Sequence, residues 1–175
     1  LLNRAINKKK IGYFQIKKTL EKAAFGISFD VNRGDSVINY TWFSLIDIGI
    51  REFFKQLQKA VKMKQTDWRF TIDFLVPKFE AIFREIVENA GGDITKVKEN
   101  GDSELKPLED LFASSIIKEI FNEDDIFLFR HTFTKVGWNI RNNVAHGLYK
   151  SFDYTLSKAI LVFLCILRLN KVTIY

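Results

Sequence analysis

Two long segments carry apolar side chains three and four residues apart, and this spacing restricts the fold more than any other feature. In residues 37–64 and 67–90 the apolar positions recur with the period of an α-helix, so each segment presents one hydrophobic stripe to a core. The chain also has only 9 glycines and 2 prolines among 175 residues. This scarcity favours long regular elements over a turn-rich β-architecture. We therefore expect helices that bury their stripes against one another.

Shorter segments complete the expected bundle. We predict further helices over residues 4–25, 107–121, 124–145 and 151–170. Ser151 or Asp153 is suited to cap the last of them. Residues 26–40 are rich in glycine, asparagine and aspartate and are predicted to form a loop. Asn100-Gly101 is a turn signal that predicts a small β-hairpin near residues 93–106. The expected fold is all-α, with about five to six helices and one small hairpin insertion.

Positive charge is concentrated near the start of the chain. Residues 1–22 hold seven basic residues against the single acid Glu21, which equals the net charge of +6 of the whole chain. We interpret residues 1–35 as a basic helical lead-in and loop, and residues 36–175 as the bundle domain. A basic segment of this kind can hold a polyanion such as RNA, and a solvated linker from a preceding domain is the alternative. The candidate nucleic-acid contacts are Lys8, Lys9, Lys10, Lys17 and Lys18.

Other sequence features bear on the cellular compartment, on metal or membrane binding and on neighbouring domains. The single cysteine, Cys165, excludes an intrachain disulfide framework and is expected to fill core space in a reducing compartment. The apolar run around it is far shorter than the ~20 residues of a membrane span, so we expect a cytoplasmic protein without membrane contact. The acids of residues 122–125 are interpreted as a helix start rather than a metal site, and we expect no cofactor. Because the chain begins at Leu1 rather than methionine, we expect it to be the C-terminal part of a longer protein with a partner domain before it.

The polar stretch WNIRNNVAHGLYK, residues 138–150, ends the helix predicted over residues 124–145. On a helical wheel centred on Ile140, the apolar residues Ile126, Phe129, Phe133, Val136 and Val144 fall on one face, which we assign to the core. Asn142 and His146 are four residues apart and are expected to share the opposite face. Leu128 and Trp138 fall on the outward side too, which predicts a second contact surface for a partner helix or a twin subunit.

These residue types suit metal-free chemistry on RNA. Histidine changes protonation near neutral pH, so His146 is a candidate general acid or base. Arg141 can hold a phosphate through its planar guanidinium, and Asn142 can orient either partner. Attack by the RNA 2′-hydroxyl on the adjacent phosphate requires a base and a cation, and DNA lacks that hydroxyl. The alternative is a surface histidine whose charge suits a helix C-terminus.

The string Arg141-Asn142-Asn143-Val144-Ala145-His146 resembles the signature of the HEPN superfamily, an arginine followed after four to six residues by histidine, often with asparagine after the arginine. The wider WNIRNNVAHG block is similar to a HEPN-like C-terminal domain family of unknown function. The resemblance implies a bundle of four or five helices that dimerises through the motif, and many members are metal-independent ribonucleases of toxin, antiphage-defence or RNA-processing systems. Arg84 is a candidate second cation, although we prefer to interpret it as an exposed helix residue paired with Glu80 or Glu88.

The first hypothesis is therefore an endoribonuclease of HEPN type that acts as a homodimer, with a composite site built from Arg141, Asn142 and His146. A non-catalytic HEPN-like module that binds nucleotide, RNA or a protein partner is the second hypothesis. A structural dimerisation bundle is the third.

Overall fold

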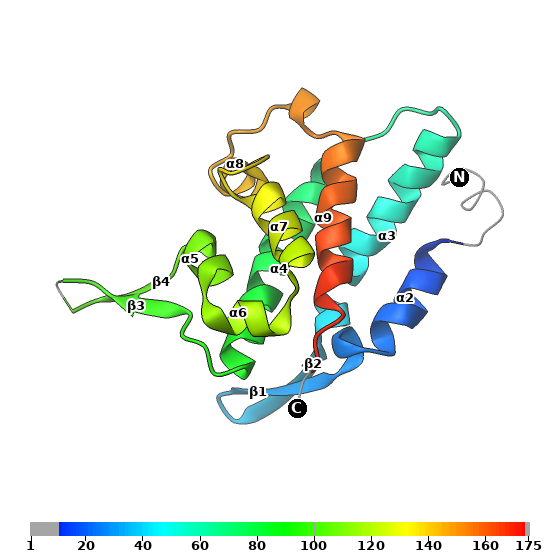
Figure 1. Ribbon diagram of the computed structural model, residues 1–175. Helices are drawn as coiled ribbons and strands as arrows, with labels where there is room; N and C mark the ends of the chain where they lie inside the picture. The colour runs from blue at the N-terminus through cyan, green and yellow to red at the C-terminus, as the bar shows by residue number, and fades with distance from the viewer. Residues whose placement is uncertain (1–10, 100, 174–175) are drawn as a thin grey trace.

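The computed structural model describes residues 11–99 and 101–173, and this part of the chain is mostly helical with two small antiparallel hairpins (Figure 1). The first half contains α2 (Tyr13–Glu21), η1 (Ala24–Gly26), β1 (Ser28–Arg33), β2 (Ser36–Thr41), α3 (Trp42–Val61) and α4 (Arg69–Asn89). The second half contains β3 (Thr95–Val97), β4 (Ser103–Leu105), α5 (Leu108–Ala113), α6 (Ser115–Ile120), α7 (Glu123–Phe133), α8 (Ile140–Ala145), η2 (Ser151–Asp153) and α9 (Leu156–Leu169).

The long helices form the centre of the molecule. α4 packs against both α3 and α9, and α7 packs against α9. The 20 residues of α3 and the 21 of α4 confirm the helices predicted from apolar spacing over residues 37–64 and 67–90, except that residues 37–41 belong to strand β2 and not to the first helix. None of the described helices has the length and apolar character needed to cross a membrane.

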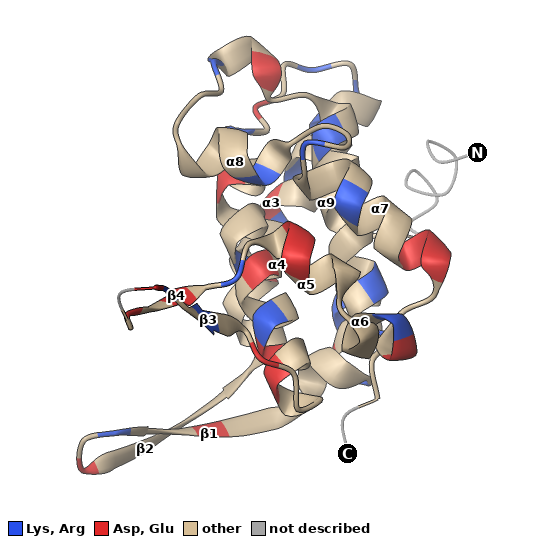
Figure 2. Cartoon of the chain, turned by 60° about the vertical axis from the view of Figure 1, so that its left-hand side comes forward, with Lys and Arg blue, Asp and Glu red and all other residues tan. Residues whose placement is uncertain are grey.

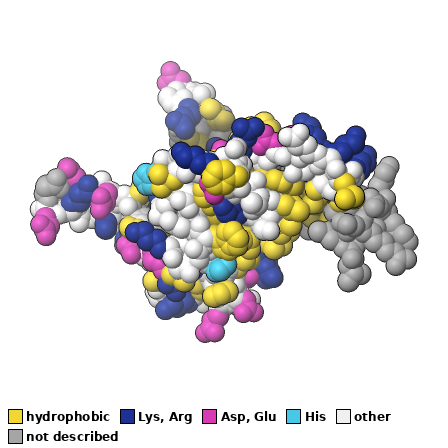
Figure 3. Space-filling model, turned by 90° about the horizontal axis from the view of Figure 1, so that it is seen from above, with side chains coloured by type: hydrophobic (Ala, Val, Ile, Leu, Met, Phe, Trp, Pro, Cys, Tyr) yellow, Lys and Arg dark blue, Asp and Glu magenta, His cyan; other side chains and the backbone are white. Residues whose placement is uncertain are grey.

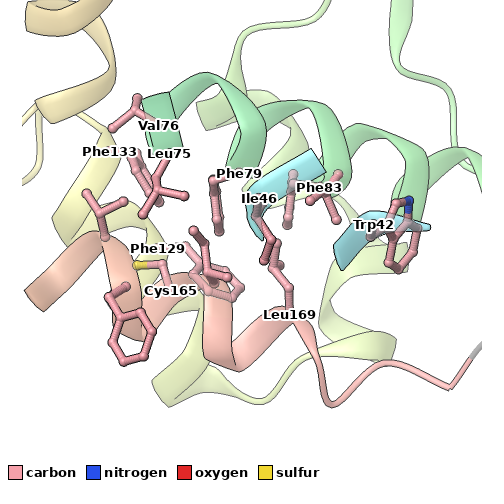
Figure 4. Packing of buried hydrophobic residues seen from close by; sticks show 14 of the residues in the cluster. Trp42, Ile46, Leu75, Val76, Phe79, Phe83, Phe129, Phe133, Cys165 and Leu169 are labelled. Atoms are coloured by element: carbon pink, nitrogen blue, oxygen red, sulfur yellow. The ribbon is translucent and has the colours of Figure 1, made fainter. Parts of the chain in front are cut away.

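Aromatic rings pack among aliphatic side chains in the core between these helices (Figure 4). Phe79 of α4 stacks on Phe133 of α7 with ring centroids 4.1 Å apart, and it also contacts Phe129 at 5.3 Å. Cys165 of α9 is fully buried among them, which confirms its predicted role as a small apolar residue. Leu20 and Phe25, from the predicted lead-in, are also fully buried in this core.

The two hairpins project from the bundle (Figure 1). β3 and β4 confirm the hairpin predicted near residues 93–106, with Thr95 opposite Leu105. The loop predicted over residues 26–40 is wrong, because β1 and β2 form a longer antiparallel hairpin there. Its strands pair over six positions and carry Tyr40 back to the bundle, where the tyrosine hydroxyl donates to Glu85 at 2.8 Å.

Three predicted helices differ from those in the structure. Residues 107–121 form two short helices, α5 and α6, because Ser114 adopts an extended conformation between them. The last helix is capped by Thr155, whose side chain accepts from the Lys158 amide, rather than by Ser151 or Asp153, which lie in η2. The third difference, within residues 124–145, determines the geometry of the motif.

Candidate functional site

The prediction of one continuous helix over residues 124–145 is wrong. α7 ends at Phe133, and α8 begins only at Ile140. Thr134 adopts an extended conformation, with φ −110° and ψ 173°, which breaks the helical hydrogen-bond ladder. The motif therefore lies on a separate helix of six residues, which packs against α4 and α7.

A tight turn between the two helices causes the break. The Trp138 amide donates back to the carbonyl of His131 at 2.8 Å. The backbone at Gly137 passes so close to His131 that a Cβ atom there would lie 2.0 Å from the same carbonyl oxygen. Asn139 then takes a left-handed conformation with φ 50°, which asparagine adopts more readily than most residues. The turn thus depends on a glycine and an asparagine at fixed positions.

Because the helix breaks, the outward face differs from the one that the helical wheel predicts. Leu128, expected to face outward, is partly buried and packs against the hydrophobic core. Val136, expected to face the core, is 61% exposed. Trp138 is exposed, as expected, and its indole Nε1 donates to His131 Nε2 at 3.0 Å. The predicted contact surface therefore keeps Trp138 and loses Leu128.

An exposed group of rings and one aliphatic side chain surrounds this turn, and we call it the α7–α8 patch. It consists of Phe127, His131, Val136 and Trp138. The His131 ring stacks on Phe127 with centroids 5.7 Å apart, so the patch is continuous from α7 to the turn. Figure 3 shows the end of the molecule at which α8 lies, where groups of hydrophobic and of basic side chains lie near one another at the surface. His131, the second of the two histidines of the chain, is partly exposed.

The three motif residues have different environments on α8. Arg141 and Asn142 are half-buried, whereas His146 is exposed at the C-cap. Gly147, with φ 61°, follows and ends the helix. Asn142 and His146 are one turn apart, as expected, with the His146 amide donating to the Asn142 carbonyl at 3.0 Å.

Glu80 of α4 holds Arg141 in place. Arg141 Nε donates to Glu80 Oε2 at 2.7 Å, and Nη2 donates to Oε1 at 3.2 Å, which is a bidentate pair. Arg141 Nη1 donates to Asn142 Oδ1 at 3.1 Å. The side chain of Glu80 is only 15% exposed, while that of Arg141 is 34% exposed. The guanidinium is therefore oriented by the protein on one side and open to a ligand on the other.

Arg84 completes this cluster from the next turn of α4. Its Nη2 donates to Glu80 Oε1 at 2.7 Å and to the Lys106 carbonyl at 2.9 Å. The preferred pairing of Arg84 with Glu80 is confirmed, but its expected exposure is wrong, because Arg84 is buried. The contact with the Lys106 carbonyl joins the segment just before α5 to the cluster. Figure 2 shows α4, α5 and α8 together in one view.

The cluster carries a net charge of +1, because two arginines share one carboxylate. Burial of Glu80 opposes its ionisation, but the hydrogen bonds from Arg141 and Arg84 outweigh burial and lower the pKa of Glu80 below its ordinary value of 4.5. Sequence reasoning considered Glu80 only as a partner of Arg84. The spacing of Glu80 and Arg84 signals that pair, but nothing in the sequence signals the contact with Arg141, 61 positions away.

A groove of about 410 Å³ opens beside this cluster. Arg141 and Asn142 line it together with Glu109 of α5 and Lys135 of the turn. His146 is not among the residues that line it. A single copy of the chain thus brings Arg141 and Asn142 together at a groove, whereas His146 lies outside the groove on an exposed helix end.

Lys158 of α9 fixes the segments on either side of α8. Its ammonium lies 4.1 Å from the centre of the Tyr149 ring and 5.7 Å from that of Trp138, and it donates to the Asp153 carbonyl at 2.7 Å. Lys158 is 8% exposed, so these contacts replace most of the water around its charge.

Of the predicted nucleic-acid lysines, the two that the structure describes lie away from this site. Lys8, Lys9 and Lys10 lie outside the described residues. Lys17 and Lys18 lie on α2, which packs against α3, whereas α8 packs against α4 and α7 (Figure 1). Lys17 also forms an ion pair with Glu21 at 3.5 Å. Across residues 11–99 and 101–173, no group of three or more His, Cys, Asp or Glu side chains is placed to hold a metal ion.

Comparisons with known proteins add no assignment. No family model matches this chain, and no curated protein or solved structure matches it. Any functional conclusion therefore rests on the residues of the site and on the resemblance of the motif.

Proposed function

We propose that this chain is a HEPN-like endoribonuclease that cleaves RNA without a metal ion. The observation that carries the proposal is the placement of Arg141, whose guanidinium is oriented by Glu80 and Asn142 at the edge of a groove and is still partly exposed. An oriented, accessible guanidinium suits a phosphate group, because its donors match two phosphate oxygens. The exposed His146 at the end of the same helix supplies the titratable group.

The reaction needs one bond to form and one to break. The 2′-hydroxyl oxygen bonds to the adjacent phosphorus while the bond from phosphorus to the 5′-oxygen breaks, which leaves a 2′,3′-cyclic phosphate and a 5′-hydroxyl. His146 accepts the proton of the 2′-hydroxyl, and Arg141 stabilises the charge that develops on the phosphate oxygens. The departing 5′-oxygen requires a proton from a second acid. His146 of a twin subunit is suited to this role.

The proposed homodimer brings these groups together. The α7–α8 patch supports it, because Phe127 and Val136 are 66% and 61% exposed next to the motif, and neighbouring exposed apolar side chains suit a contact surface. A two-fold axis through the patch would place two α8 helices side by side. Trp138→Glu is expected to yield a monomer in analytical ultracentrifugation and to lose cleavage. A wild-type protein that is monomeric at all concentrations yet cleaves RNA would contradict the composite site.

The decisive experiment compares three oligonucleotides of one sequence in EDTA: RNA, 2′-O-methyl RNA and DNA. We expect cleavage of RNA alone, because the methylated strand keeps the A-form backbone and lacks the attacking hydroxyl. His146→Ala and Arg141→Ala are expected to reduce cleavage at least about 100-fold. Arg33→Ala is the matched control, since it removes an exposed arginine of β1 that lies outside the motif and the α7–α8 patch. Cleavage that survives His146→Ala would refute the assignment.

A second function is favoured by the same geometry. Glu80 occupies two donors of Arg141, and His146 lies outside the groove of its own chain, which suits a module that binds RNA or nucleotide without cutting it. Such a module would bind RNA and 2′-O-methyl RNA equally, with an affinity that falls as salt is raised, and would leave both intact. Neither binding nor cleavage, with a stable dimer, would instead identify a dimerisation bundle.

A further inference from the structure

The groove beside Arg141 combines apolar walls with hydrogen-bonding groups at its edge. Its apolar wall is formed by Pro107, Leu108, Phe133 and Val136. Phe133 forms the buried floor of this wall, because it is 2% exposed and its ring stacks on Phe79 at 4.1 Å, whereas Val136 is 61% exposed. A volume of about 410 Å³ falls within the range of about 300–1,000 Å³ typical of small-ligand sites. A single unstacked RNA base needs such a surface, since bases bind through their faces to apolar and aromatic side chains.

Glu109 supplies acceptors at the groove. Arg130 donates two hydrogen bonds to Oε1 of Glu109, one from Nη2 and one from Nε at 2.9 Å. Among the described residues, none donates a hydrogen bond to Oε2. A carboxylate offers about four acceptor positions. The Arg130 pair therefore fixes the orientation of Glu109 and leaves acceptor capacity for a ligand. The Glu109 side chain is 41% exposed, so a ligand can reach it.

Asn142 supplies a donor at the same groove. Its Oδ1 accepts from Arg141 Nη1 at 3.1 Å, which fixes the amide so that the NH₂ group is the side available to a ligand. Arg141 itself also lines the groove. A carboxylate with spare acceptors and an amide donor thus lie around one apolar wall.

This combination selects among the four bases. Guanine presents two adjacent donors, N1–H and the N2 amino group, which can both donate to Oε2 of Glu109, and its O6 accepts from an amide donor. Adenine and cytosine present one amino group next to a ring nitrogen acceptor, so a carboxylate would face a lone pair. Uracil presents one donor between two acceptors. We infer that the groove lined by Glu109, Asn142 and Val136 binds a guanine base of the RNA, next to the phosphate held by Arg141.

This inference rests on the proposed function for its substrate, but its first test does not require cleavage. The purified protein is titrated with GMP, AMP, CMP and UMP and followed by calorimetry or NMR. GMP is expected to bind at least about tenfold more tightly than the others, because hydrogen bonds to a charged acceptor contribute most of the discrimination. Equal binding of all four nucleotides, or no binding of any, would overturn the inference.

Three variants test the role of the Glu109 carboxylate. Glu109→Gln replaces one acceptor oxygen by a donor and is expected to abolish the preference for GMP. Glu119→Gln, the same change at an exposed position of α6, is expected to leave it intact. Arg130→Gln keeps the carboxylate but removes the ion pair that orients it, so the preference should weaken without being lost. If Arg130→Gln and Glu109→Gln lose the preference alike, the effect is structural and Glu109 does not read the base.

Cleavage then tests the position of the base. RNA strands with a single guanosine are compared with strands that carry inosine there, since inosine keeps N1–H and O6 but lacks the N2 amino group. We expect cutting next to guanosine and about tenfold slower cutting next to inosine. Selective GMP binding without cleavage would refute the nuclease and keep the groove assignment. Cleavage that depends on His146 but is equally fast next to every base would support the nuclease and refute the groove assignment.

Discussion

Removal of the Glu80 charge should destabilise the protein, because buried Arg84 would lose its ion-pair partner. Glu80→Gln keeps the size of the side chain but removes the negative charge that faces Arg84 and Arg141 at 2.7 Å. Arg84 is 8% exposed and would keep the Lys106 carbonyl, at 2.9 Å, as an acceptor. The Arg141 side chain is 34% exposed and can turn toward water. Most of the cost therefore falls on Arg84.

Breaking a buried ion pair by removing one partner costs about 3–5 kcal/mol. Because Arg84 keeps one acceptor and Arg141 reaches solvent, we expect the lower end, about 3 kcal/mol. In urea-induced unfolding followed by circular dichroism, a slope of about 2 kcal/mol per M converts this into a midpoint lower by about 1.5 M.

The control is Glu88→Gln, on the exposed side of the same helix, which should change the free energy of unfolding by less than about 0.5 kcal/mol. Combining Glu80→Gln with Arg84→Met should recover part of the loss, because no buried charge then remains unpaired in α4. A midpoint for Glu80→Gln equal to that of Glu88→Gln would refute this account of the cluster.

The ion pairs of Glu80 with Arg84 and Arg141 predict that the free energy of unfolding depends on pH. Hydrogen bonds from Arg141 and Arg84 outweigh burial and hold the pKa of Glu80 in the folded state below 4.5, so the unfolded chain takes up this proton first as pH falls. The stability that Glu80 contributes is therefore complete above about pH 4.5 and is lost as pH falls through the lowered folded-state pKa. Wild type should lose more stability than Glu80→Gln over this range, and parallel acid curves would contradict the pairing.

Three further predictions concern the turn and the core. Gly137→Ala should destabilise the protein by about 2 kcal/mol, because the added Cβ would meet the His131 carbonyl and force the turn open; thermal unfolding measures this. Asn139→Ala should be less stable than Asn139→Gly by about 1 kcal/mol, since both remove the amide and only alanine is strained at φ 50°; equal stability would show that the turn relaxes. Burial raises the pKa of Cys165 to about 12, so iodoacetamide should not label the native protein at pH 8, and labelling should follow the urea unfolding curve.

Periodicity was sufficient to predict the helices that lie along the core. α3 and α4 form where apolar residues recur every three to four positions, because burying one continuous stripe is possible only for a helix. The β1–β2 hairpin was missed although Phe29 and Val31 alternate with polar residues there. The glycine, asparagine and aspartate content of the segment favoured a loop, and only the pairing of one strand with the other makes it a hairpin.

Sequence alone determined which residue types the motif offers: a guanidinium, an amide and an imidazole within six positions. Their arrangement was decided by tertiary structure. The close approach of Gly137 to His131 ends α7, so α8 turns away from the direction that a continuous helix would have taken. Glu80 then orients Arg141 across 61 positions of sequence, and Glu109 joins the groove from α5. Local spacing sets which residues share a helix face, but contacts between distant helices depend on how the whole core packs, and no local pattern encodes them.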